Sequence, residues 1–480
     1  SELAMHTPEY AGSESQRLLL ITTQFPHRTE FLEDEIHVLS RAYEQIEIAP
    51  IAPRGPIRVP LPPNVNVSYG LARQWAGRSS VSRRLTRPVG NALRSRLLRH
   101  CRPHQRLQHW QERLKYLQIA LVNAAEAGAH YAWASGATEP AVVYSYWLGS
   151  GSIGLRRAWP SVPLVSRAHG GEIFAQQHGV SETPLLEHML AACTIVASVS
   201  QSGLEHLSAL HPRASDRLRV SRVGIRDLGQ LNPMPSQYEL KLLSVSTVDE
   251  NKRVHAIARV AQALATTTPE TRVHWDHFGD GPELPRLDRE CREGRNPRNL
   301  SVSLHGHVDN DLVRRHLQQQ PTSVFINLSE SEGTPVSLME AQCVGIPCVA
   351  THVGGSVEVL TPDLDATVAI DTPASQTAAT VMDLVRRDSA SNREARRRNW
   401  REHFETNQAS GTLLDLLGQA REAQRRGCGR QRRDAVQVGG SDRKPDSTNR
   451  PDSALEAAVG PESDEAPLPA EACPWRACSS

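Results

Sequence analysis

The stretch Phe325-Ile-Asn-Leu-Ser-Glu-Ser-Glu-Gly-Thr-Pro-Val-Ser-Leu-Met-Glu-Ala341 determines the local fold and the ligand it can hold. Residues 324–328 are apolar and rich in β-formers, as in a buried strand. A polar turn follows at 329–333. Thr334 and Pro335 then open a run of good helix formers, Thr as the cap and Pro at the first helical position. We therefore predict a strand, a glycine-containing turn and a helix.

The start of this helix has the chemistry of a phosphate site. The backbone amides of Val336, Ser337 and Leu338 have no partner within the helix and lie at the positive end of its dipole. Glu332 and Glu340 bracket them. A carboxylate repels phosphate but accepts hydrogen bonds from sugar hydroxyls. Phosphate and sugar together indicate a nucleotide-sugar.

Length, charge and cysteine content exclude several classes of protein. A chain of 480 residues is long enough for two domains with sizeable cores, and its net charge of +1 indicates no nucleic-acid partner. We predict neither a transmembrane helix nor a secretory signal, because no run of about 18 apolar residues occurs and the beginning lacks a basic and apolar leader. The eight cysteines form no Cys-x-x-Cys pair, which favours free thiols in the cytoplasm.

Alternating strand and helix patterns predict a first doubly wound domain at 17–230, after a flexible arm at 1–16. The expected strands are 18–22, 46–51, 141–147, 162–167, 195–199 and 218–223, with a helix at 31–39. Ligands of open α/β sheets bind at the carboxyl ends of the strands, where His169 follows the strand at 162–167. His169, with two glycines beside it, is therefore a candidate site residue; the structural alternative is a packed histidine.

A second doubly wound domain is expected at 231–400, after a Gly-, Pro- and Asn-containing linker at 227–237. Its expected strands are 242–246, 273–278, 300–304, 324–328 and 347–350, and its helices are 253–266, 309–319, 335–344 and 381–401. We expect a terminal helix at 401–425, whose return to the first domain is an open alternative. The residues from 426 to 480 have few aliphatic side chains, which predicts a disordered tail.

A basic segment at 73–115 has a single acidic residue, Glu112, among many arginines and interleaved Trp and Leu. One interpretation is a surface for anionic lipid at the inner face of a membrane, or for an anionic acceptor. The other is a solvated Arg-rich helical hairpin. The segment has no nucleic-acid recognition motif.

Ordered motifs make the chain resemble the GT-B glycosyltransferases, and more narrowly the retaining family four, which includes exopolysaccharide and capsule enzymes. The motifs are 29–36, 144–147, 166–170, 252–253, 277–282, 305–308, 325–340 and 350–358. The resemblance covers about 18–402 and implies two Rossmann-like domains that face each other across a cleft.

The resemblance implies catalytic roles for three residues. Lys252 matches the basic residue that holds the diphosphate and neutralises charge on the leaving group. Glu332 matches the residue that meets hydroxyls of the transferred sugar, and His169 the histidine at the reacting face. The implied reaction retains the anomeric configuration and needs no metal. His305 and His307 alternate faces of a strand, so we expect them to be structural.

The resemblance also implies a donor site in the second domain, where Glu340 accepts hydrogen bonds from the ribose hydroxyls. The other expected binding residues are Gly333, Thr334, Pro335, Val336, Arg253 and Gly279. Relatives usually place an arginine a few residues before the lysine, but Ser246-Thr247 stands there in this chain. That cation is therefore absent or supplied by Arg253.

The resemblance implies a metal-independent retaining hexosyltransferase of polysaccharide or glycoconjugate biosynthesis. It would use a nucleotide-diphosphate-sugar as donor, no cofactor, and a glycan, lipid-linked or small-molecule acceptor. Two alternatives remain open at this point. One is a degenerate GT-B subunit that binds a sugar nucleotide or a partner without turnover, and the other is a GT-B phosphorylase or epimerase.

Overall fold

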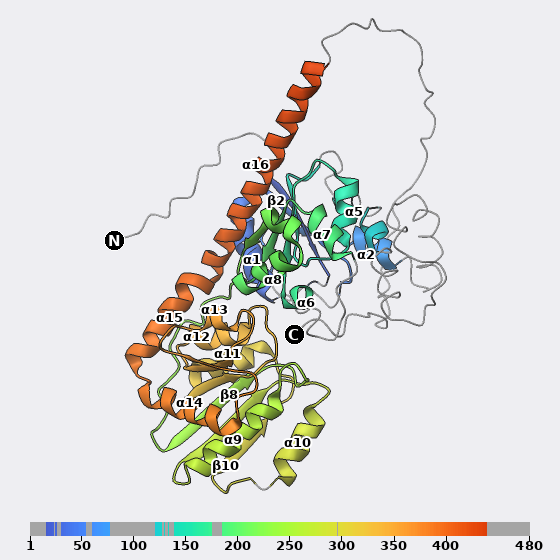
Figure 1. Cartoon of the computed structure of the whole chain (residues 1–480). Helices are drawn as coiled ribbons and strands as arrows, with labels where there is room; N and C mark the ends of the chain where they lie inside the picture. Colours follow the sequence, from blue (N-terminus) through green and yellow to red (C-terminus); the bar gives the residue numbers. More distant parts are fainter. Residues whose placement is uncertain are drawn as a thin grey trace, which may run out of the picture. The chain divides into compact units, whose positions relative to one another are not determined.

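A computed structural model of the chain describes residues 16–23, 25, 30–53, 60–76, 121–126, 129, 133, 139–174, 185–294 and 296–438. Residues 1–15 of the expected arm, most of the basic segment and the residues from 439 onward lie outside these ranges. The chain divides into two units, Ser1–Gln424 and Arg425–Ser480. The first unit contains two sheets, each covered by helices (Figure 1).

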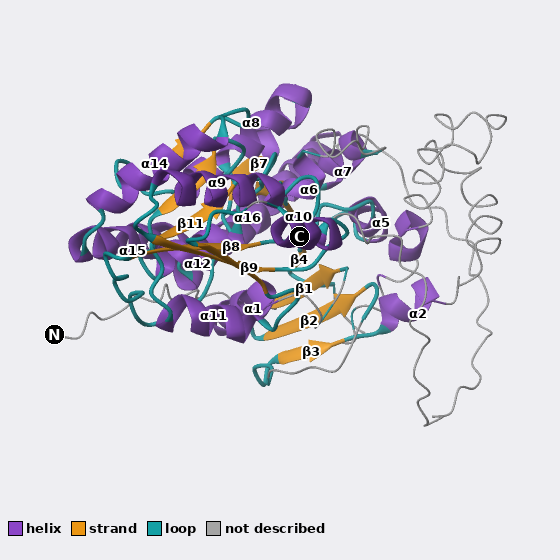
Figure 2. Ribbon diagram, turned by 90° about the horizontal axis from the view of Figure 1, so that it is seen from below, coloured by secondary structure: helices purple, strands orange, loops and turns teal. Residues whose placement is uncertain are grey.

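The first domain is built on a seven-stranded sheet of order β3-β2-β1-β4-β5-β6-β7, in which every pair is parallel. Its strands are β1 (Arg17–Thr22), β2 (Gln45–Pro50), β3 (Val65–Val67), β4 (Val142–Ser145), β5 (Leu164–Ala168), β6 (Ile195–Ser198) and β7 (Leu218–Val220). Strands β1, β2 and β3 lie side by side at one edge (Figure 2). The three-residue β3 was not among the expected strands, because it is too short for a recognisable pattern.

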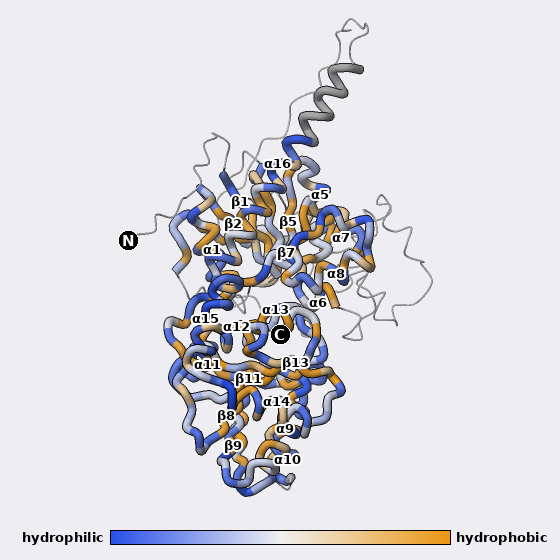
Figure 3. The backbone as a smooth tube through the Cα atoms, turned by 60° about the vertical axis from the view of Figure 1, so that its left-hand side comes forward, coloured by the Kyte–Doolittle hydropathy of each residue, from blue (hydrophilic) through white to orange (hydrophobic). Residues whose placement is uncertain are grey.

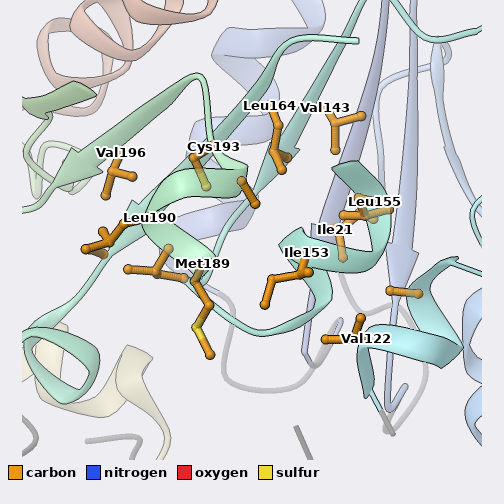
Figure 4. Packing of buried hydrophobic residues seen from close by; sticks show 14 of the residues in the cluster. Ile21, Val122, Val143, Ile153, Leu155, Leu164, Met189, Leu190, Cys193 and Val196 are labelled. Carbon is orange, nitrogen blue, oxygen red and sulfur yellow. The ribbon is translucent and has the colours of Figure 1, made fainter. Parts of the chain in front are cut away.

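The helices of this domain are α1 (Glu30–Ala42), α2 (Gly70–Ala76), α5 (Gly151–Ala158), α6 (Gly170–Ile173), α7 (Leu186–Ala192), α8 (Gln201–Leu210) and the 3-10 helix η3 (Pro212–Arg217). Successive strand residues pack into different clusters, Leu19 and Ile21 on one face and Leu18 and Leu20 on the other. Both faces are thus buried, as in doubly wound folds. Figure 4 shows side chains of α5 and α7 packed over the first face.

The second domain has a six-stranded parallel sheet of order β10-β9-β8-β11-β12-β13. Its strands are β8 (Glu239–Val245), β9 (Arg272–Phe278), β10 (Leu300–Leu304), β11 (Val324–Asn327), β12 (Cys348–Thr351) and β13 (Ala366–Val368). Its helices are α9 (Val254–Thr267), α10 (Leu284–Glu293), α11 (Asn310–Gln319), α12 (Val336–Cys343), α13 (Ser356–Val359), α14 (Ala374–Arg387) and α15 (Ala390–Phe404). Apolar segments gather in the strands of both domains (Figure 3).

The helix expected at 381–401 is two helices, α14 and α15, which separate at Asp388 and Ser389. Ser389 is the N-cap of α15 and accepts a hydrogen bond from the Asn392 amide at 3.2 Å. The side chain of Asp388 is almost fully buried and pairs with the guanidinium groups of Arg393 and Arg396, each at 2.7 Å. The Ser389 cap and the buried ion pairs of Asp388 mark where α14 ends and α15 begins.

Replacing Asp388 by Ala is expected to lower the free energy of unfolding by about 3–5 kcal/mol, because two buried cations lose a partner. Asp383→Ala is the matched control, since the Asp383–Arg387 pair is exposed and is worth less than about 1 kcal/mol. Urea unfolding of both variants checks the prediction. Equal midpoints would contradict it.

Two segments connect the domains, and they lie side by side. The amide of Ile225 donates to Phe404 O at 3.0 Å, and the amide of Thr406 donates to Ile225 O at 3.1 Å. Helix α16 (Thr406–Val438) begins here. Its leucines Leu413, Leu416 and Leu417 pack in the same cluster as β1, so this end of the helix covers the first sheet.

Helix α16 continues to Val438, beyond residue 426, where the sequence predicts the tail to begin. Residues 419–437 contain many Gln, Arg and Ala, which are good helix formers, and this favours continuation of the helix despite two glycines. In the part of the chain that the structure describes, no helix is both long and apolar enough to cross a membrane.

Candidate functional site

The two domains meet backbone to backbone at Gly170, which follows β5, and Gly333, which follows β11. A Cβ atom on Gly170 would lie 2.7 Å from Gly333 N, and one on Gly333 would lie 2.6 Å from Gly170 N. Only glycine permits this approach at either position. Because His169 and Glu332 are the preceding residues, the contact brings the two expected halves of the site together.

Lys252 and Glu332 form a buried pair beside this contact. Lys252 Nζ lies 3.0 Å from Glu332 Oε1 and 3.2 Å from Oε2, and each side chain is 8% exposed. Asn327, at the end of β11, donates to Glu332 Oε1 at 3.2 Å. The Lys252 amide donates to Asp249 at 2.9 Å, which fixes the loop before α9. A cation and a carboxylate are thus held together at the carboxyl edge of the second sheet.

Glu340 lies within α12 and is nearly buried. The Nε of Arg314, on the neighbouring α11, lies 3.4 Å from Glu340 Oε1. Arg314 was not expected at the site, and no motif signals it, because its proximity to Glu340 depends on the packing of α11 against α12. Arg314 also acts on Asp34 of α1. Burial raises the pKa of the Asp34 carboxyl, and the positive charges of Arg226 and Arg314 lower it.

His169 is held between aromatic rings and the start of α6. Its ring centroid lies 4.2 Å from Trp147 and 5.1 Å from Tyr146. Both ring nitrogens are buried and lack a hydrogen-bond partner among the described residues. Burial lowers the pKa of His169 well below its usual value, and the charge of Arg167 lowers it further, which favours the neutral imidazole. A neutral ring can accept at one nitrogen and donate at the other.

Buried hydrogen bonds fix the segments on either side of His169. Arg167 donates to Glu35 Oε2 at 2.6 Å, and the Tyr144 hydroxyl donates to Glu35 Oε1 at 2.9 Å. The His169 amide donates to Glu172 Oε2 at 2.8 Å, and burial raises the pKa of Glu172 to about 8. The sequence singled out neither Glu35 nor Glu172, although both lie in or beside matched motifs.

The helix start differs by one residue from its expected position. Pro335, with φ −74° and ψ 109°, is the N-cap of α12, and the helix begins at Val336. The Thr334 hydroxyl does not cap the helix but donates to Val199 O of the first domain at 2.8 Å. Local propensity could not reveal this competing acceptor. The amides of the first helical turn still begin at Val336, close to Glu332.

Arg253 and Gly279, which were also expected in the donor site, make other contacts in the structure. Arg253 is not brought to the Lys252–Glu332 pair, because its guanidinium donates to Leu328 O at 3.4 Å and to Ile370 O at 2.8 Å. Gly279, with φ +146°, donates to Gly306 O at 2.9 Å, and a Cβ there would collide with Ser246 O. Gly279 therefore permits close packing of the loops that follow β8, β9 and β10.

The sequence of the second domain matches a known family. Residues 239–387 match the family described as Glycosyl transferases group 1. The chain is 28% identical over 211 residues to N-acetyl-alpha-D-glucosaminyl L-malate synthase of Bacillus anthracis, which is 42% of this chain and 52% of that protein. The chain thus spans about half the length of the curated relatives it matches.

Solved structures share the whole fold at low sequence identity. Sucrose-phosphate synthase from Thermosynechococcus elongatus aligns with a TM-score of 0.59 at 15% identity, covering 85% of this chain and 100% of that one. Anabaena Alr3699/HepE in complex with UDP and glucose aligns with a TM-score of 0.55 at 15% identity, covering 84% and 100%. These likenesses, with the two parallel sheets, confirm the expected GT-B architecture.

Proposed function

We propose that the protein is a retaining, metal-independent hexosyltransferase acting on a nucleotide-diphosphate-sugar, because residues 239–387 match the glycosyl transferases group 1. Its acceptor would be a glycan, a lipid-linked sugar or a small molecule, in polysaccharide or glycoconjugate biosynthesis in the cytoplasm. The observation that carries the proposal is the contact of Gly170 with Gly333, which brings His169 and the Lys252–Glu332 pair to one junction.

Each charged group at the junction suits one part of such a donor. The Lys252 ammonium and the first amides of α12 would bind the diphosphate and stabilise its charge as it leaves. The Glu332 and Glu340 carboxylates would accept hydrogen bonds from hydroxyls of the transferred sugar and of the ribose. Neutral His169 would contact a hydroxyl of the transferred sugar from the first domain.

Retention follows in this proposal from the side of attack. The acceptor hydroxyl would approach the anomeric carbon on the face from which the diphosphate leaves. The transition state has oxocarbenium character, so charge stabilisation contributes more than a strong nucleophile. We assign no nucleophilic carboxylate. Diphosphate binding would compete with Glu332 for Lys252, which frees a Glu332 oxygen for the sugar.

The first test is donor binding by the full chain. The complexes of Anabaena HepE with UDP and with UDP-glucose make these two compounds the first probes, followed by other nucleotide-sugars. Glu340→Ala is expected to raise the Kd of UDP roughly tenfold to hundredfold, the value of one or two hydrogen bonds to a charged group. Glu330→Ala is the control, because it removes an exposed carboxylate from the loop that precedes α12. Equal Kd values for both variants and the wild type would place the ribose elsewhere.

A degenerate subunit is the second candidate, favoured by the lack of an arginine at positions 246 and 247. Thr247 stands where relatives usually have arginine, and its hydroxyl bonds Asp249 at 2.7 Å. Calorimetric binding of UDP-glucose without UDP release, across malate, monosaccharide and lipid-linked acceptors, would favour this candidate. Release of UDP that depends on an acceptor would favour transfer. Phosphate-dependent cleavage or donor epimerisation would identify a phosphorylase or an epimerase.

A further inference from the structure

The matched motif at 350–358 ends in Glu358, which has no role in the proposed chemistry. Glu358 lies on α13 of the second domain, yet its carboxylate contacts the first domain. Its Oε2 accepts from the Gln201 amide at 3.0 Å, and its Oε1 accepts from the Ser202 amide at 2.9 Å. Arg222 of the first domain donates to Oε2 at 2.7 Å. One side chain thus makes three charge-assisted hydrogen bonds between domains.

These bonds satisfy the first turn of α8. Ser200 is the N-cap of α8 and accepts from the Gly203 amide at 3.0 Å, which leaves the amides of Gln201 and Ser202 for an outside acceptor. A carboxylate there also interacts favourably with the helix dipole. Helix α8 is therefore fully capped only while the second domain lies against it.

The residues before Glu358 and before α8 also contact the loop at 332–334, which we call the donor loop. The amide of Gly355 donates to Glu332 O at 3.1 Å, and a Cβ on Gly355 would collide with Gly333 O. Thr334 donates to Val199 O, two residues before Gln201. The loop with Glu332 and Gly333 is thus held between the loop that leads to Glu358 and the start of α8.

We propose that Glu358, Arg222 and the amides of Gln201 and Ser202 form an interdomain clasp that positions the donor loop against His169. Glu358 is a positioning residue, because it acts through the 332–334 loop and contacts no reacting atom. The clasp is made when the domains close and breaks when they open to exchange the donor. Its catalytic consequence depends on the proposed transfer, but its effect on closure does not.

Three variants remove the clasp in different ways. Glu358→Gln removes the charge and replaces one acceptor oxygen with an amide, and Arg222→Met removes the guanidinium. Gln201→Pro removes one donor N–H and leaves the helix intact, because Pro is well tolerated at the first helical position and Ser200 is already extended. Glu205→Gln is the control, since Glu205 is exposed on α8 and accepts from the Gln201 side chain.

The experiment measures closure and turnover separately on the full chain. Solution X-ray scattering without donor is expected to show a larger radius of gyration for Glu358→Gln than for wild type and Glu205→Gln. With UDP-glucose or the active donor, the kcat of Glu358→Gln is expected to fall roughly tenfold to hundredfold, the usual rate cost when reacting groups are slightly misplaced. Its Tm should change little. Arg222→Met and Gln201→Pro should show the same changes to a smaller degree. Arg222→Met should add less to Glu358→Gln than it costs alone.

Each outcome decides the proposal. Unchanged scattering and kcat in all three variants would overturn the clasp, as would additive effects of Glu358→Gln and Arg222→Met. A lower Tm for Glu358→Gln with unchanged scattering of Arg222→Met and Gln201→Pro would assign only structural roles to these residues. If wild type transfers no sugar, the proposed function fails, and scattering alone then decides the clasp.

Discussion

Lys252→Met is expected to reduce kcat for sugar transfer roughly 10²–10³-fold, the usual cost of removing one group that stabilises developing charge. Lys252 is the one cation that pairs with Glu332 in the described structure. Arg253 bonds the carbonyls of Leu328 and Ile370, and positions 246–247 carry no charge. Loss of Lys252 should therefore leave the leaving diphosphate to the helix amides alone.

The same substitution leaves a buried carboxylate without its cation, so stability must be measured beside turnover. We expect Lys252→Met to lower the free energy of unfolding by about 3–5 kcal/mol. The double variant Lys252→Met, Glu332→Gln removes both charges and should recover most of that stability without recovering kcat. Lys241→Met is the control, because its pair with Glu239 is partly exposed. Wild-type kcat in the double variant would contradict the role of Lys252.

Gly333→Ala is expected to lower kcat by about hundredfold or more, because its Cβ would lie 2.6 Å from Gly170 N and would keep the two domains apart. Gly170→Ala should have the same effect, since its Cβ would meet Gly333 N at 2.7 Å. Backbone lies on both sides of the contact, so no side chain can rotate away. UDP affinity should change less than kcat, because the donor is expected to bind mainly to the second domain.

The control for these glycine variants is Gly411→Ala on α16, where no atom lies within 4 Å of the added Cβ. That change should be neutral or should stabilise the protein by about 0.5–1 kcal/mol, the usual gain in a helix interior. Steady-state kinetics and solution scattering of all three variants check the prediction. Wild-type turnover in both Gly170→Ala and Gly333→Ala would show that transfer does not require this contact.

Much of the fold is predictable because it depends on local patterns. The apolar run at 324–328 corresponds to β11, and the helix expected at 253–266 corresponds to α9. Parallel sheets bury both faces, so their strands are continuous apolar runs that stand out in the sequence. The three-residue β13 and the break between α14 and α15 lack such a pattern. A short strand has too few residues, and Asp388 acts through buried partners.

The sequence by itself determined two doubly wound domains, because local patterns carry that information, and its motifs suggested Glu332, Glu340, Lys252 and His169 as site residues. The tertiary structure alone decided their partners. Arg314 lies beside Glu340, Thr334 bonds Val199, and Glu358 caps a helix of the other domain. Hydrogen bonds and ion pairs need atoms about 3 Å apart. The packing of α11 against α12 brings Arg314 to Glu340 from 26 positions away, and the packing of the two domains brings together the other pairs, which are 135 and 157 positions apart.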